Sequence, residues 1–133
     1  MSSPLSTADG SARAVTGAAL LDAAFVVVFA AIGRASHAED VLGGLAVTAW
    51  PFLVALAAGW AVALAWRAPA APLRTGIPVW ALTVVGGMLL RAVSGQGVQV
   101  AFVIVASLVL GLFLIGWRAV ALLVRRARSR RRV

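Results

Sequence analysis

Residues 14–33 read AVTGAALLDAAFVVVFAAIG, and this stretch decides the fold class of the chain. It has about 20 residues, the length that an α-helix needs to cross the hydrocarbon core of a bilayer. Asp22 is the only charged residue within it. Because backbone groups in lipid must be paired within their own segment, we predict that this stretch is a transmembrane helix.

Three further apolar stretches follow, each long enough to cross a bilayer as a helix. They run over residues of about 41–66, 77–94 and 98–124. Only short connections separate the four stretches, and they lie at Arg34–Asp40, at Arg67–Gly76 with its two prolines, and at Gly95–Gly97. Short connections force neighbouring helices to run antiparallel. The sequence therefore predicts an all-α integral membrane protein, an up-down-up-down four-helix bundle over residues 14–124.

The composition supports lipid as the solvent of this bundle. Of the 133 residues, 62% are hydrophobic, and the mean hydropathy is +1.01. A soluble chain of this size could not bury so much apolar surface. The sequence has no Cys and no Lys, which excludes thiol chemistry, Cys-based metal sites and a lysine Schiff base. His37 is the single histidine, too few for a multi-histidine metal site.

The distribution of arginine predicts the orientation. Nine arginines lie on the side of the two termini and the second connection, whereas the other side has Arg34, with Arg91 near it. The positive-inside rule then places both termini in the cytoplasm. So large a bias argues against a mixture of molecules inserted in the two opposite orientations.

The two ends of the chain are polar. We expect residues 1–13 to be a disordered cytoplasmic N-terminus and residues 125–133 to be a basic cytoplasmic tail. A cleaved signal peptide is the less favoured alternative, because the first apolar run is long and contains Asp22. The net charge of +8 gathers in the tail of an apolar body, which fits a membrane surface better than nucleic acid. The arginines expected to contact anionic lipid are Arg125, Arg126, Arg128, Arg130, Arg131 and Arg132.

Asp22 and Arg118 are the two charges placed deepest in the predicted helices. Asp22 lies nine positions after Arg13, or roughly 13 Å into its helix, and Arg118 lies seven positions before Arg125, or roughly 10 Å. An acid at that depth is a functional-site candidate. We predict an intramembrane ion pair, with an architectural role favoured over catalysis. In the alternative, Arg118 extends to the headgroups and Asp22 is protonated.

Two further groups of residues are candidates. An outer polar cluster would be either a solvated rim or a vestibule for a ligand or ion, and it comprises Arg34, His37, Glu39, Asp40 and Arg91. Trp50-Pro51 interrupts the second helix and predicts a kink. A helix kink and packing stripe is predicted at Gly44, Thr48, Pro51 and Gly59, where small residues allow close helix packing.

The order of several short motifs resembles a family of small prokaryotic membrane proteins, the domain of unknown function 3054 family. The motifs are Leu21-Asp22-Ala23, Gly33-Arg34 followed by His37, Trp50-Pro51, Gly87-Met88-Leu89-Leu90-Arg91 before Gly95-Gln96-Gly97, and Gly116-Trp117-Arg118. They span about residues 20–118. The resemblance implies a four-helix membrane domain in the inner (plasma) membrane of a prokaryotic cell. It implies no established activity. Small multidrug transporters share four helices and an acid in the first, but that acid is Glu. Fluoride channels match in length and helix count without a matching motif.

The sequence contains no phosphate-binding loop, nucleophile triad or pair of catalytic carboxylates. We therefore expect no enzymatic activity, no catalytic residue, no cofactor and no metal. A non-enzymatic structural or partner-binding membrane component is the leading hypothesis, with lipid, a second copy or another membrane protein as the partner. The alternative is a small oligomeric transporter or channel that uses Asp22 for proton or cation coupling.

Overall fold

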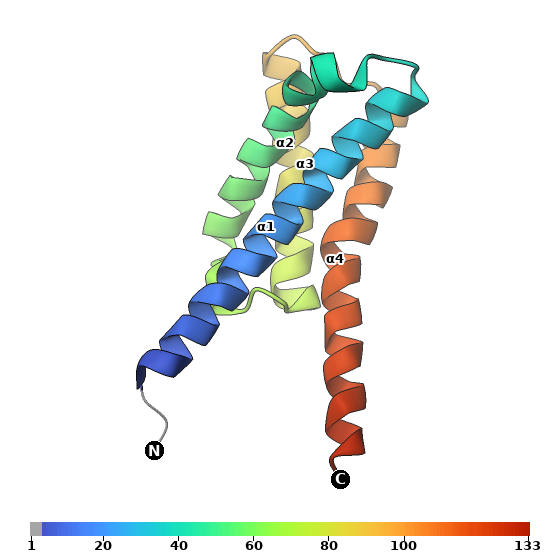
Figure 1. Cartoon of the computed structure of the whole chain (residues 1–133). Coiled ribbons are helices and arrows are strands. Elements are labelled where there is room, and N and C mark those ends of the chain that lie inside the picture. Colours follow the sequence, from blue (N-terminus) through green and yellow to red (C-terminus); the bar gives the residue numbers. More distant parts are fainter. Residues whose placement is uncertain (1–3) are drawn as a thin grey trace.

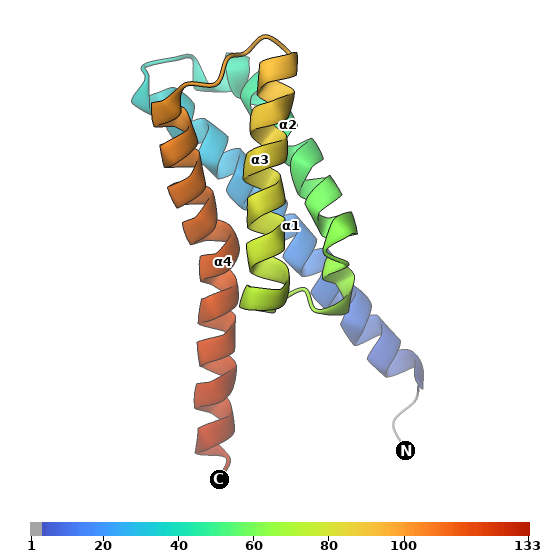
Figure 2. The same ribbon diagram turned by 180° about the vertical axis from the view of Figure 1, so that it is seen from behind.

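Four long helices pack side by side in the computed structural model, which describes residues 4–133 (Figure 1). They are α1 (Pro4–Ser36), α2 (Val41–Val62), α3 (Ile77–Val93) and α4 (Val100–Arg131). Helix α1 packs against α2 and α4, and α3 packs against the same two helices. Both ends of the described chain lie at the same end of the bundle, and the view from behind shows the same arrangement (Figure 2). The predicted all-α four-helix fold is confirmed.

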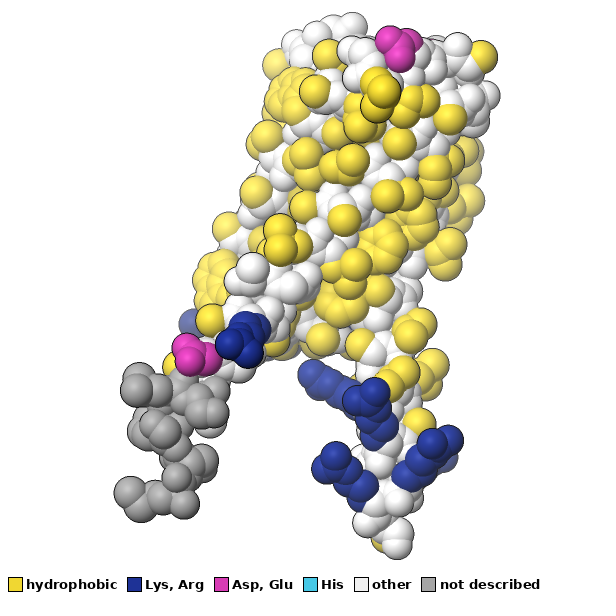
Figure 3. All heavy atoms as spheres, in the orientation of Figure 1, with side chains coloured by type: hydrophobic (Ala, Val, Ile, Leu, Met, Phe, Trp, Pro, Cys, Tyr) yellow, Lys and Arg dark blue, Asp and Glu magenta, His cyan; other side chains and the backbone are white. Residues whose placement is uncertain are grey.

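Four helical segments of the described chain are long and apolar enough to cross a membrane, and the third of them, Pro72–Val93, includes the five residues before α3. Figure 3 shows hydrophobic side chains along the flank of the bundle and arginine side chains at the end near the termini. The exposed apolar residues include Leu20, Val28, Leu108 and Leu112. This distribution fits a multi-pass membrane protein whose flanks contact lipid.

The first and last helices, α1 and α4, are longer than predicted. Helix α1 begins at Pro4, so it includes residues 4–13, for which the sequence predicted no helix; residues 1–3 lie outside the described residues. Proline is tolerated in a first helical turn, and extending an existing helix adds one hydrogen bond for each residue fixed. Helix α4 continues to Arg131 instead of ending near 124, so most of the basic tail is helical. Arginines in a last turn favour this extension through the helix dipole.

The connection between α2 and α3 replaces the predicted last turn of α2. Helix α2 ends at Val62, and Leu64 adopts a left-handed conformation with φ of 51°. A 3₁₀ turn (Ala65–Arg67) and a π turn (Pro72–Gly76) follow. Thr75 Oγ1 donates a 2.6 Å hydrogen bond to the Ala68 carbonyl and closes the connection on itself. This segment, residues 63–76, is called the α2–α3 connection below.

Helices α2 and α3 approach each other closely at small residues. A Cβ atom added to Gly86 would lie 2.9 Å from the Cβ of Ala55, and one added to Gly87 would overlap the ring of Phe52. Gly59, from the predicted stripe, lies against the backbone of Val79. These contacts leave no room for a side chain at Gly86 or Gly87, and little room at Gly59.

The rest of the predicted stripe divides between the core and the outer end of the bundle. Pro51 is buried, and α2 is continuous through it. Gly44 lies beside the guanidinium group of Arg34, and Thr48 accepts a 3.1 Å hydrogen bond from Arg34 Nη1. Only the inner half of the stripe therefore serves helix packing, and the outer half accommodates a charged side chain.

We expect Gly87→Ala to lower the free energy of unfolding by about 1–3 kcal/mol, because the added methyl group overpacks a fully buried ring. Gly33→Ala on α1 is the matched control, since its Cβ would meet nothing within 4 Å. The control should be neutral or gain up to about 1 kcal/mol of helix propensity. Thermal unfolding in detergent, followed by circular dichroism, measures both. Equal stability of the two variants would contradict the close approach.

Candidate functional site

Asp22 on α1 lies at the centre of a closed polar network. Its side chain is 0% exposed. Oδ1 accepts hydrogen bonds from Trp117 Nε1 at 2.8 Å and from Arg118 Nη1 at 3.0 Å. Oδ2 accepts from Trp60 Nε1 and from Arg118 Nη2, at 2.9 Å and 2.7 Å. Two N–H donors on each oxygen match the acceptor pattern of an ionised carboxylate.

Arg118 on α4 is equally enclosed and reaches three parts of the chain. Its guanidinium forms a two-pronged ion pair with Asp22, the geometry in which Arg–carboxylate bonds are strongest. Nε donates to the Pro69 carbonyl of the α2–α3 connection at 2.8 Å, and Nη1 also donates to Leu114 O at 2.6 Å. The guanidinium carbon lies 4.6 Å from the ring centre of Trp117. These contacts join α1, α4 and the connection between the two other helices.

The depth of these residues explains why they meet. Asp22 lies nine positions from Arg13 on α1, and Arg118 lies seven positions from Arg125 on α4. Because both arginines lie at the same end of the bundle, the two helices place Asp22 and Arg118 at a similar depth. The sequence analysis did not identify Trp60 and Trp117 as hydrogen-bond donors to Asp22. One signal was present: Trp60 lies seven positions before Arg67, as Arg118 lies seven before Arg125. A buried acid at that level needs N–H donors, and an indole supplies one.

We refer to Asp22, Trp60, Trp117 and Arg118 as the central network. Among residues 7–133, every buried side-chain nitrogen and oxygen has a hydrogen-bond partner. A buried ion pair whose remaining donors and acceptors are satisfied is stable where it stands, because the desolvation of both charges is offset by short, well-aligned bonds. The central network therefore has the chemistry of a structural joint between helices.

The outer polar cluster gathers at the other end of the bundle. Arg34 Nη1 lies 3.0 Å from Glu39 Oε2, and Arg34 Nε donates to the Asp40 carbonyl at 2.7 Å. Arg91 donates to Gln96 Oε1 at 3.0 Å and lies over the ring of Phe102. A cavity of about 480 Å³ is lined by residues that include Arg34, His37, Glu39 and Arg91. The structure brings these four together, whereas Asp40 joins only through its backbone.

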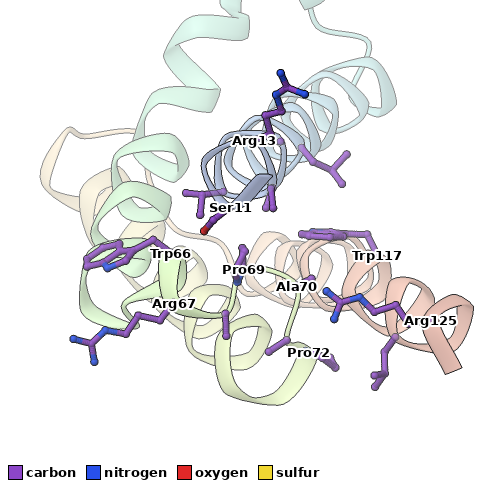
Figure 4. A pocket seen from close by; sticks show the side chains of 17 residues that line it. Ser11, Arg13, Trp66, Arg67, Pro69, Ala70, Pro72, Trp117 and Arg125 are labelled. Carbon is purple, nitrogen blue, oxygen red and sulfur yellow. The ribbon is translucent and has the colours of Figure 1, made fainter. Parts of the chain in front are cut away.

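A second cavity, of about 700 Å³, lies beside the central network at the end of the bundle where the termini lie. Its walls come from α1, from the α2–α3 connection and from α4, and it is called the basal groove below (Figure 4). Arg125, one of the tail residues predicted to contact lipid, lines it together with Arg13 and Arg67. The other predicted lipid-contacting arginines, Arg126, Arg128, Arg130, Arg131 and Arg132, are exposed beyond the groove.

Among residues 7–133, no group of three or more His, Cys, Asp or Glu could hold a metal ion. The three acids outside the central network lie away from it: Asp9 lies in the second turn of α1, and Glu39 and Asp40 follow the end of that helix.

Comparison with known proteins identifies the family. The family model described as "Protein of unknown function (DUF3054)" matches residues 19–121, well over half of the chain. The matched range includes every residue of the central network and of the outer polar cluster. No curated protein and no solved structure matched the chain. The chain belongs to the DUF3054 family, as the order of its short motifs predicted.

We expect Asp22→Asn and Arg118→Gln each to lower the free energy of unfolding by about 3–5 kcal/mol, because each leaves a buried charge without its partner. The double variant should lose less than the sum of the two single losses. Unfolding of the purified protein in detergent measures this coupling energy.

The partly exposed pair Arg34–Glu39 provides the control for that cycle. Its side chains are 17% and 52% exposed, so Arg34→Gln with Glu39→Gln should show a coupling energy of about 1 kcal/mol or less. If the coupling energy between Asp22 and Arg118 were no larger than that of the control pair, the ion pair would not act as a joint between the helices.

Proposed function

We propose that this member of the family is a non-enzymatic membrane component whose bundle serves as a scaffold for a membrane partner. The observation that carries the proposal is the closure of the central network. Asp22, the residue best placed for coupling chemistry, is 0% exposed and already accepts four hydrogen bonds. These four bonds occupy the lone-pair acceptor sites of the carboxylate and leave none for a substrate.

The same observation weighs against a transporter that cycles Asp22 between protonation or ion-bound states. Such a cycle requires the carboxylate to exchange its partners with water or a cation. Here the exchange would separate a fully desolvated ion pair and strand two indole N–H groups. Removing a partner from a buried pair costs about 3–5 kcal/mol. A single four-helix bundle also leaves little space for a wetted path beside the apolar core.

The outer cavity is the specific observation that favours the second candidate function, a small oligomeric transporter or channel. It combines Arg34, Arg91, His37 and Glu39 in one polar recess. However, Arg34 is held by Glu39 and by the Asp40 carbonyl, and Arg91 is held by Gln96. Between this recess and the central network lies the aromatic cluster of Phe29, Phe52 and Phe102. The recess therefore fits a solvated polar rim better than the entrance of a transport pathway.

Flux measurements in liposomes test the proposal. We expect wild-type protein to carry no more protons or monovalent cations than protein-free liposomes, and Asp22→Asn to give the same baseline. Cross-linking and co-purification from native membranes should in turn yield a homo-oligomer or a second membrane protein. A monomer without a partner, with a flux that Asp22→Asn abolishes while the variant remains folded, would overturn the proposal in favour of the transporter.

The proposed orientation places both termini in the cytoplasm of a prokaryotic cell. Because the chain contains no cysteine, single substitutions report accessibility without background. We expect Ser94→Cys, in the exposed turn after α3, to react with a membrane-impermeant maleimide in intact cells. Ser129→Cys, in the exposed basic end of α4, should react only after permeabilisation. The reverse pattern would show the opposite orientation, and equal labelling of both would show a mixture.

A further inference from the structure

The basal groove combines unpaired positive charge with apolar walls. Arg13, Arg67 and Arg125 line it from three different parts of the chain, and its lining includes no Asp or Glu. Among the described residues, no carboxylate lies within 4.0 Å of these guanidinium groups, although Asp9 precedes Arg13 by one turn of α1. Most of the remaining lining is apolar, and it includes Ala14, Val15, Ala18, Leu21 and Leu122.

The side chains are arranged with charge at the rim and apolar surface inside. Figure 4 shows Arg125 extending from α4 towards Ala70 of the α2–α3 connection, whereas the ends of Arg13 and Arg67 point away from the groove. Trp66 and Trp117 complete the wall on either side. Indole rings and arginines together are typical of the headgroup level of a bilayer. The groove is therefore at the level where a lipid headgroup meets its acyl chains.

The walls of the groove are held in place by the central network. Trp117 donates its indole N–H to Asp22, and Pro69 accepts a hydrogen bond from Arg118. The α2–α3 connection is also fixed by the bond from Thr75 to Ala68. A preformed cavity of about 700 Å³ lies within the usual size range of small-molecule sites. Preorganisation reduces the entropy that binding would otherwise lose.

We propose that the basal groove binds one anionic phospholipid, with its phosphate near Arg125 and part of an acyl chain along Gly17, Ala18 and Leu21. Charge complementarity selects this occupant, because Arg125 extends along the groove without a carboxylate partner, and Arg13 and Arg67 add positive charge at its rim. The apolar walls in turn match hydrocarbon. A second copy of this chain would bring further arginines against the same rim. The inference goes beyond the proposed scaffold role and does not depend on which leaflet the groove faces.

Titration of delipidated protein in detergent, followed by native mass spectrometry, tests the site. The probes are dioleoyl phosphatidylglycerol, dioleoyl phosphatidylcholine with the same chains, and glycerol 3-phosphate. We expect one phosphatidylglycerol to bind per chain, at least fivefold more tightly than phosphatidylcholine. Glycerol 3-phosphate alone should bind much more weakly, because it lacks the chains that fill the apolar wall.

A pair of neighbouring arginines separates the groove from the tail. Arg125→Gln should weaken phosphatidylglycerol binding by about fivefold, the effect of one basic residue near an anionic lipid. Arg126→Gln removes the same charge from the next residue, which does not line the groove, and should change the affinity by less than about twofold. Equal losses in the two variants would assign the lipid to the tail and overturn the proposal.

A pair of glycines tests the apolar wall without changing any charge. Both Gly10 and Gly17 lie in α1, and a Cβ at either would meet nothing within 4 Å, but only Gly17 lines the groove. Gly17→Leu should therefore fill the groove and reduce the affinity at least fivefold, whereas Gly10→Leu should leave it unchanged. Both substitutions favour the helix, so this pair decides the question even if Arg125→Gln fails to fold.

Besides equal losses in the two arginine variants, three results would overturn the proposal: equal affinity for the two lipids, full binding of glycerol 3-phosphate, or wild-type affinity in Gly17→Leu. None of them bears on the scaffold proposal, which the flux and co-purification results decide. Conversely, a flux that requires Asp22 would leave the lipid titration to be judged by its own variants.

Discussion

A charged side chain inside a bilayer must find its partner within the protein, and here Asp22 on α1 finds Arg118 on α4. The two residues lie 96 positions apart, so the pair fixes the first helix against the last. Both side chains are 0% exposed, which removes water as an alternative partner. Shifting either helix along its axis would separate the charges in a medium of low dielectric constant. The register of α1 and α4 is therefore set mainly by this pair.

The pair also stabilises a segment that apolar packing alone would not hold. The α2–α3 connection departs from helical structure at Leu64, and irregular backbone near lipid needs partners for its carbonyl groups. Arg118 supplies one of these partners through its Nε bond to Pro69, and Thr75 supplies another. Arg118 can do so because a guanidinium carries five donors, more than one carboxylate accepts. The charge that pairs with α1 thus also fixes the turn between α2 and α3.

Hydrophobic length and the spacing of arginines were sufficient to predict the four helices, their order and the meeting of Asp22 with Arg118. The roles of Trp60 and Trp117 were not predicted, because an indole near a helix end is equally suited to the headgroup region. The left-handed Leu64 carries no sequence signal, since that conformation is usually taken by Gly. The helical conformation of residues 4–13 was missed because their composition is polar, and composition does not report extension from an existing helix.

The distribution of satisfied and unsatisfied charge indicates where this protein can interact with other molecules. Inside the bundle, Asp22 and Arg118 neutralise each other and hold Trp117 and Pro69 in place. At the end where the termini lie, the arginines around the groove and along the end of α4 have no carboxylate partner among the described residues. A neutral, rigid interior beside an uncompensated basic rim favours binding at the headgroup level over transfer through the core. The central network then contributes to function indirectly, by keeping the walls of the basic rim in a fixed arrangement.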